Sequence, residues 1–218
     1  MPASSLALSP LRRGRPPIAG LRQNILGAAA GIFSRHDYHE VLMEDVAQAC
    51  GVGKGTLYRY FPSKRALYVA VMFEGMERLH DDLQVALATT DPPVRKIERV
   101  VRCILAHFWD RRFFFSLIQR NEHKPNDPDN REWLRRRAQL SRIIQHAIEE
   151  GTASGHVRPL DTRIATEMLL GMLRGANRYR SSHDTLDAMV GAVVDVFVCG
   201  VGTEEGRRLT GNGRLRRR

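Results

Sequence analysis

The sequence is poor in aromatic residues, in cysteines and in long hydrophobic runs. Aromatic residues make up only 7% of the 218 residues, and the apolar-polar alternation typical of β-strands is scarce, so helices should dominate. The three cysteines, Cys50, Cys103 and Cys199, lie far apart and form no Cys-x-x-Cys pair. This spacing argues against a disulfide framework or a zinc site. We expect the three cysteines to be buried and to pack as small hydrophobic residues.

Signals for export or membrane insertion are also missing. The N-terminus has no apolar run after a basic start, as a signal peptide would have. The longest apolar stretch, residues 188–202, is too short to span a bilayer. We therefore expect a cytoplasmic protein without a membrane partner.

No catalytic or metal-binding motif is present in the sequence. It contains no Gly-x-Ser-x-Gly, no phosphate-cradling Gly-rich loop and no His-Glu-x-x-His. The eight histidines are scattered without metal-ligand spacing. We therefore predict no catalytic residues, no metal and no cofactor; an enzyme housed in the second half is an alternative that no residue supports.

Positive charge is what the sequence has in excess. The formal net charge is +10 and the pI is about 10.2, which favours an anionic partner. Residues 1–65 carry a net charge of +5 and residues 206–218 carry +6, whereas residues 66–205 carry −1. A general polyanion binder would be basic throughout, so this distribution favours a nucleic-acid-binding end joined to a neutral body.

Residues 46–64, with the sequence VAQACGVGKGTLYRYFPSK, carry the clearest functional pattern. A short apolar helix meets a break at Gly51, and a second short helix follows around one apolar anchor, Leu57. A buried helix of this length would not carry so many basic and hydroxyl-bearing side chains, which are the groups that bind phosphates. The pattern predicts a helix-turn-helix whose second helix is sized for the DNA major groove.

The first turn of this second helix has the chemistry to read base edges. Lys54 can donate to guanine O6 or N7, and the methyl group of Thr56 can touch thymine. Gly55 leaves room for a close backbone approach. We exclude the acidic Glu44 from the base-reading set.

The rest of the helix suits phosphate oxygens, which fix register without reading sequence. Tyr58, Tyr60 and Lys64 are predicted phosphate contacts, and Arg59 suits either bases or phosphates. The alternative is a charged turn that only faces solvent.

This stretch resembles the signature of the TetR-type transcriptional regulators. That signature runs Ile-Ala, Ala-Gly-Val and then Ser-Lys-Gly-Thr-Leu-Tyr-x-Tyr-Phe-x-Ser-Lys, and its places are filled by Val46-Ala47, Cys50-Gly51-Val52 and residues 53–64. The resemblance implies operator contacts at these positions, dimerisation through the last two long helices, and an effector cavity between the middle helices. Gly53 replaces the usual Ser as a weaker N-cap. Val41 and Leu42 stand where the family usually has Thr or Ser, so that side-chain cap is missing.

Residues 1–17 form a predicted flexible basic leader. Its Arg13-Gly14-Arg15-Pro16 resembles the core of an AT-hook, so Arg13 and Arg15 are candidate minor-groove contacts. The alternative is an unstructured basic arm with only a diffuse electrostatic effect.

Hydrophobic periodicity and Pro, Gly and Ser breaks set the expected elements. The helix-turn-helix domain covers residues 18–65, with helices at about 18–35, 43–50 and 54–60. A helical effector-binding and dimerisation domain covers residues 66–201. Its helices are expected at about 64–87, where Ser63 is the N-cap, and at about 94–110, 113–122, 129–150, 161–181 and 184–201. Residues 202–218 are expected to be a flexible Arg-rich tail.

The last expected helix is apolar on nearly all sides, which requires burial on more than one face. In a chain of this size that favours burial against a second subunit, although burial within one subunit is the alternative. The predicted dimer interface comprises Gly171, Gly175, Met189, Val190, Val193, Val194 and Phe197.

Aromatic residues concentrate at the junction near residues 108–115. Some of them must be ordinary core, and a His or Arg nearby is more often at the surface than in a ligand site. The predicted effector pocket comprises Arg102, His107, Phe108, Phe114, Arg174 and Arg178.

We therefore predict an all-α protein with an N-terminal three-helix helix-turn-helix domain and a C-terminal helical domain. The predicted function is sequence-specific transcription regulation by a homodimeric repressor. It would bind a palindromic double-stranded DNA operator and be released by an unknown small-molecule effector. The main alternative is a non-specific architectural DNA-binding protein.

Overall fold

The computed structural model describes residues 19–109 and 128–209. Every regular secondary-structure element within these ranges is an α-helix. A single isolated antiparallel bridge joins Val157 to Gly202. The predicted all-α fold is therefore confirmed. The predicted leader 1–17, the predicted helix 113–122 and residues 210–218 of the predicted tail lie outside the described residues.

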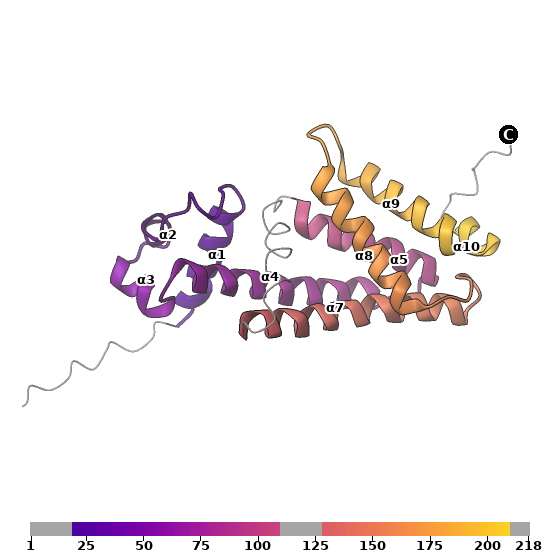
Figure 1. Cartoon of the computed structure of the whole chain (residues 1–218), viewed down its shortest axis with the longest axis horizontal. Helices are drawn as coiled ribbons and strands as arrows, with labels where there is room; N and C mark the ends of the chain where they lie inside the picture. Colours follow the sequence, from indigo (N-terminus) through magenta and orange to yellow (C-terminus); the bar gives the residue numbers. More distant parts are fainter. Residues whose placement is uncertain (1–18, 110–127, 210–218) are drawn as a thin grey trace, which may run out of the picture.

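Three short helices form a small head at one end of the molecule (Figure 1). They are α1 (Leu21–Phe33), α2 (Met43–Ala49) and α3 (Lys54–Tyr60). Their inner faces share one apolar core, because each helix turns its hydrophobic stripe inward. That core contains Ile25, Leu26, Ala29, Phe33, Val46, Ala47, Leu57 and Phe61.

The turn between α2 and α3 depends on Gly51. This residue has φ 66°, in the left-handed region that disfavours a side chain. Its N–H donates to the carbonyl of Gln48 at 3.0 Å, and the Val52 N–H donates to the carbonyl of Ala47 at 2.9 Å. This pair of bonds is a Schellman ending, which stops α2 and aims α3.

The helix starts in the head use different caps. Ser63 Oγ accepts the Ala66 N–H at 3.1 Å, so the predicted cap of α4 is confirmed. Gly53 is the N-cap of α3 in extended conformation, as expected. Leu42 offers α2 no capping oxygen, but the Asp45 carboxylate accepts the Leu42 backbone N–H at 3.4 Å.

Helix α4 (Lys64–Leu87) runs from the head into the larger domain (Figure 1). Its 24 residues span about 36 Å. Near its start, the Tyr68 ring packs edge-on against Phe33 and Tyr38, with centroids 4.9 and 5.1 Å apart. The domain boundary expected at residues 65–66 therefore falls at the beginning of a helix that both domains share.

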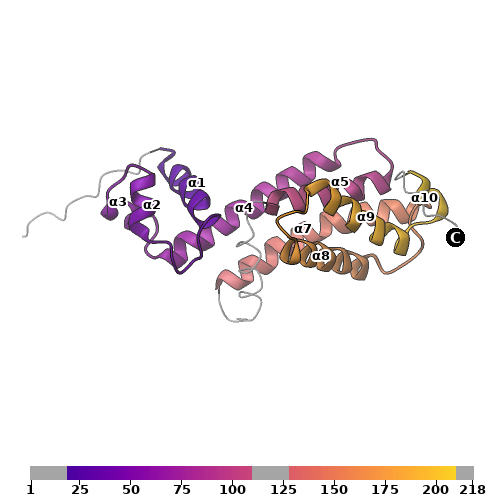
Figure 2. The same ribbon diagram turned by 90° about the horizontal axis from the view of Figure 1, so that it is seen from above.

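The larger domain packs around α5 (Pro93–Trp109), which contacts α4 and three further long helices. These are α7 (Pro128–Ala153), α8 (Thr162–Tyr179) and α9 (Leu186–Val201). Figure 2 shows α8 and α9 next to each other on the side away from α4. The inner stripe of α5 is almost completely buried and includes Val94, Ile97, Val100, Val101, Ile104 and Leu105.

The expected flexible tail is wrong at its beginning, because residues 204–209 form helix α10 (Glu204–Leu209). The Thr203 N–H donates to the carbonyl of His156 at 3.0 Å and fixes the approach to α10. Gly206 lies so close to the same carbonyl that any side chain there would collide with it. Local contacts with the loop before α8 therefore order a segment that composition alone marks as a tail.

None of the helices in residues 19–109 and 128–209 is both long and apolar enough to cross a bilayer.

Candidate DNA interface and ligand cavity

Helix α3 separates a buried side from an exposed side. Leu57 is 0% exposed, so the predicted anchor is confirmed as core, and Phe61, just after the helix, is 3% exposed. The opposite side is open to solvent at Lys54, Gly55, Tyr58 and Arg59, while Thr56 and Tyr60 are half-buried. Four of the six residues predicted to meet DNA from α3 therefore lie on its exposed face, and Tyr60 packs partly against the core.

Lys54 has a partner that the sequence reasoning left out. Its ammonium forms an ion pair with the carboxylate of Glu44, across the turn from α2. This hydrogen bond lowers the pKa of Glu44 and raises the pKa of Lys54. Both side chains are more than half exposed, so the pair holds Lys54 in place while leaving it reachable by DNA. Lys54 Nζ also lies 5.9 Å from the centroid of the Tyr58 ring.

Lys64 occupies a different environment from the one predicted. Its ammonium donates to the backbone carbonyls of Tyr38, His39 and Val41 at 2.8, 3.3 and 2.9 Å. It also lies 4.7 Å from the centroid of the Tyr38 ring. Three acceptors use all three ammonium donors, so the predicted phosphate contact at Lys64 is replaced by a structural tether. The tether joins the first residue of α4 to the loop between α1 and α2.

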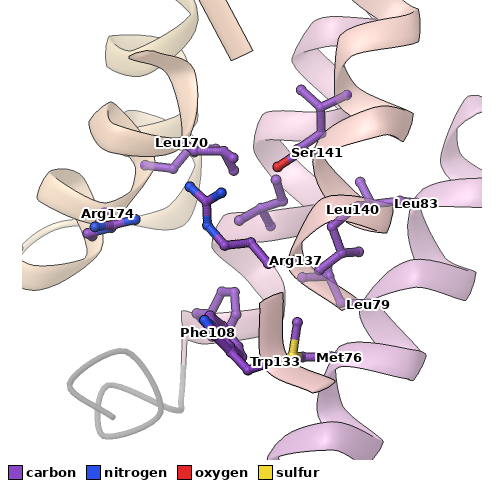
Figure 3. Close-up of a pocket in the computed structure, with 13 residues that line it drawn as sticks. Met76, Leu79, Leu83, Phe108, Trp133, Arg137, Leu140, Ser141, Leu170 and Arg174 are labelled. Carbon is purple, nitrogen blue, oxygen red and sulfur yellow. The ribbon is translucent and has the colours of Figure 1, made fainter. Parts of the chain in front are cut away.

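A cavity of about 80 Å³ lies among α4, α5, α7 and α8 (Figure 3). Two of the predicted pocket residues, Phe108 and Arg174, are in its wall. The wall is otherwise mostly apolar. Its full lining is Met76, Leu79, Leu83, Ile104, Phe108, Trp133, Arg137, Leu140, Ser141, Ile144, Leu170, Leu173 and Arg174.

Three other predicted pocket residues do not line this cavity. Arg102 pairs with Asp187 at the start of α9, with Nη1 and Oδ1 2.6 Å apart. His107 lies on the other side of α5, beside a groove that faces α1. Arg178 is exposed and stacks over Tyr179 at 5.7 Å. A helix turns about 100° per residue, so His107, which is adjacent to Phe108, points away from the cavity. Phe114 lies outside the described residues.

Helix α7 supplies the polar groups that sequence reasoning missed. Trp133, Arg137 and Ser141 recur every fourth residue, and Leu140 and Ile144 share their face. Arg137 and Ser141 therefore interrupt an otherwise apolar stripe of α7. Such a pattern in the sequence indicates a polar site that faces inward. Figure 3 shows Arg137 reaching from α7 toward α8, where Leu170 and Arg174 lie.

The polar groups around the cavity differ in how well they are satisfied. Arg137 makes two hydrogen bonds to the carboxylate of Glu167 on α8, one of them 3.2 Å long. Ser141 Oγ and Trp133 Nε1 are buried and have no hydrogen-bond partner within the described part of the chain. Buried groups of this kind normally find a partner, so they favour a polar ligand or water in the cavity.

The predicted dimer interface is wrong at four positions. Val190, Val193, Val194 and Phe197 are at most 5% exposed and form part of the same core as α5. They are therefore buried within one subunit, which was the alternative reading of this apolar helix. Met189 is half-buried and packs at the edge of that core.

The outer faces of α8 and α9 are apolar and exposed. Met168 on α8 is 64% exposed and Val196 on α9 is 65% exposed, and Ile164 on α8 is 47% exposed. Gly171 and Gly175 continue the α8 stripe, and neither would bring a Cβ within 4 Å of a neighbour. A face of this kind on two adjacent helices is typical of a surface that a partner covers.

Two family models match the chain on either side of the start of the larger domain. A model described as bacterial regulatory proteins, tetR family, matches residues 25–71, which cover α1 to the first part of α4. A model described as tetracyclin repressor-like, C-terminal domain, matches residues 90–182, which include α5 to α8. The chain belongs to the tetR family of bacterial regulatory proteins. The prediction of a helix-turn-helix, DNA-binding transcriptional regulator is confirmed.

Two individual proteins that this chain resembles are described as transcriptional regulators. The chain is 24% identical to the HTH-type transcriptional regulator UidR of Escherichia coli K12 over 190 residues, covering 79% of this chain and 92% of UidR. It shares its fold with a putative transcriptional regulator from Saccharomonospora viridis in complex with choline, at a TM-score of 0.74 and 18% identity. That match covers 85% of this chain and all of the neighbour.

A third similar protein was solved with both a small molecule and DNA. AibR, in complex with isovaleryl coenzyme A and operator DNA, matches at a TM-score of 0.65 and 20% identity, covering 81% of this chain and 97% of AibR. At such identities the two structural neighbours show the fold alone.

Proposed function

We propose that this TetR-type regulator is a dimeric repressor that binds a palindromic operator through two copies of α3 and is released by a small molecule. The observation that carries the proposal is the exposed face of α3, opposite the buried anchor Leu57. Lys54 and Thr56 in its first turn would meet base edges. Tyr58, Arg59 and Tyr60 would contact phosphates, and Gly55 would allow close approach.

The leader adds a second element to the proposed DNA contact. Arg13 and Arg15 precede α1 directly in the sequence. They would enter the minor groove beside the site that α3 reads, where A·T-rich sequence narrows the groove and concentrates negative potential.

The dimer would form through the outer faces of α8 and α9. Met168 and Val196 are the most exposed apolar side chains on these faces apart from Tyr179. Burying them against a second copy removes apolar surface from water, at about 25 cal/mol per Å². Gly171 and Gly175 would allow the two α8 backbones to approach closely. A twofold arrangement would then fix the spacing of the two α3 helices, as a palindrome requires.

Helix α4 supplies the physical link between the cavity and the DNA. Lys64, its first residue, is tethered to the head. Met76, Leu79 and Leu83, further along the same helix, are in the cavity wall. The cavity of about 80 Å³ is much smaller than the roughly 300–1,000 Å³ of typical ligand sites. A larger ligand must therefore displace the helices around it, and displacement of α4 would move the head. The complex of AibR with a ligand and operator DNA supports such a pairing of sites.

Footprinting on the intergenic DNA beside the gene tests the proposal. We expect a discrete protected palindrome, protection that Tyr58→Ala weakens, and a dimer in sedimentation at the same concentration. Tyr58→Ala should leave the preferred base sequence unchanged, because phosphate contacts carry little sequence information. Protection without a defined site would favour the architectural alternative, and a monomer bound to DNA would contradict the proposed symmetry.

A further inference from the structure

The cavity has a wall of uneven chemistry. Most of its lining residues are apolar, and among them Leu79, Leu83 and Leu173 are each at most 4% exposed. Two guanidinium groups stand in the same wall, Arg137 from α7 and Arg174 from α8 (Figure 3). No carboxylate is among the described lining residues. The cavity wall therefore combines apolar surface with two guanidinium groups, of which Arg137 is paired with the carboxylate of Glu167.

Two buried donors flank Arg137 along α7. Trp133 precedes Arg137 by one turn and Ser141 follows it by one turn. The Trp133 side chain is buried, with the residue 3% exposed, and neither its Nε1 nor Ser141 Oγ has a partner among the described residues. An unpaired buried donor costs free energy that an acceptor in the cavity would recover. The site thus offers hydrogen-bond donors on both sides of a cation.

We propose that the effector of this cavity is an amphipathic carboxylate. Its carboxylate would lie between Arg137 and Arg174 and accept from Ser141, and its apolar chain would fill the space beside Leu79 and Leu83. Planar carboxylates fit guanidinium groups in paired hydrogen bonds, which favours this head group over an alcohol or an amine. The inference rests on the proposed function, because it names the ligand class of the same cavity.

The existing partner of Arg137 gives the ligand a way to act. Glu167 on α8 accepts two hydrogen bonds from Arg137 on α7. An incoming carboxylate competes with Glu167 for the same guanidinium, and so weakens the connection between α7 and α8. Helix α8 also carries the exposed apolar face around Met168. Ligand binding would thereby loosen α7 from the helix proposed to hold the dimer.

Fluorescence of Trp133 gives a direct binding assay. The chain has two tryptophans, Trp109 and Trp133, so Trp109→Phe leaves the cavity residue as the only indole. In that background we would titrate straight-chain carboxylates from butanoate to decanoate, each beside its matched primary alcohol and primary amine. We expect saturable emission changes with the carboxylates and at least about tenfold weaker binding of the alcohols and amines.

Three substitutions separate the roles of the charged groups. Arg174→Gln should weaken carboxylate binding about tenfold or more, because it removes a charge-assisted hydrogen bond. Glu167→Gln should strengthen it, because Arg137 is then no longer held by a competing carboxylate. Arg131→Gln on the exposed side of α7 is the matched control, and it should leave the affinity unchanged.

The results test separately the ligand class, the competition with Glu167 and the role of the ligand as an effector. The ligand class is overturned if alcohols or amines bind as tightly as the carboxylates, or if Arg174→Gln changes nothing. Weaker binding after Glu167→Gln would overturn the competition between the two carboxylates. Operator binding is measured separately, with and without ligand. If the carboxylates bind the cavity but leave operator affinity unchanged, the ligand class stands and the effector part of the proposed function fails.

Discussion

Replacing Lys64 by methionine should destabilise the head and leave the charge contacts to DNA intact. Methionine keeps the length and apolar stem of lysine but has no ammonium group. In the structure that ammonium is bonded to the carbonyls of Tyr38, His39 and Val41 and stacks on the Tyr38 ring. The substitution therefore removes a tether between α4 and the loop that precedes α2.

The size of the effect follows from how exposed these bonds are. Hydrogen bonds to a charged group contribute about 1.5–3 kcal/mol when buried. Two of the three at Lys64 are only partly buried and the third is exposed, so water would replace much of each. The cation–π contact adds about 0.5–1 kcal/mol. A total of about 2 kcal/mol is reasonable, which lowers the Tm by roughly 4–8 °C for a chain of this size.

Calorimetry and DNA binding as a function of salt test this estimate together. Lys64→Met should lower the Tm and leave the salt dependence of DNA binding unchanged when measured well below the new Tm. Arg59→Met is the matched comparison, because Arg59 is exposed on α3 and is proposed to contact a phosphate. It should change the Tm little and reduce the salt slope by about one counterion. If Lys64→Met kept the Tm and reduced the slope instead, Lys64 would be a phosphate contact after all.

Three further outcomes are expected. Val196→Asp should split the dimer into folded monomers in sedimentation, whereas Phe197→Asp should unfold the domain in circular dichroism, because an unpaired buried charge costs about 3–5 kcal/mol. Gly51→Ala should lower the Tm by roughly 2–4 °C, since its left-handed backbone costs a side chain about 1 kcal/mol. Burial raises the pKa of the Cys103 thiol to about 11, so only about a thousandth should be thiolate at pH 8 and alkylation should accelerate about tenfold per pH unit below 11.

Most of the head could be predicted from the sequence, because interactions between residues close in the chain specify it. Gly51 and Leu57 set the turn and the anchor of the helix-turn-helix, and Ser63 marks the beginning of α4. These features act within a few residues, so one sequence is enough to recognise them. The role of Lys64 was missed because its three acceptors lie 23 to 26 residues earlier in the chain.

Less of the larger domain could be predicted from the sequence, because the residues that pack together there lie far apart along the chain. Helix α9 is apolar on nearly all sides, and that pattern alone does not say which side faces α5 and which faces a second chain. Val193 and Phe197 proved to be internal, and Val196 is exposed. Arg137 and Ser141, which interrupt the apolar stripe of α7, indicate the cavity in the sequence. The aromatic cluster instead placed the predicted pocket at the end of α5.

Consecutive arginines on α7 connect the two sides of the cavity. Arg136 Nη1 lies 2.7 Å from Glu77 Oε1 on α4, and its guanidinium stacks over Phe73 at 4.9 Å. Arg137, pointing the other way, is bonded to Glu167 on α8. In the proposed function, a ligand that draws Arg137 away from Glu167 would leave the Arg136 contacts unchanged. Helices α7 and α4 would then move together relative to α8. Because α4 begins at the tether of Lys64, that motion would reach the head.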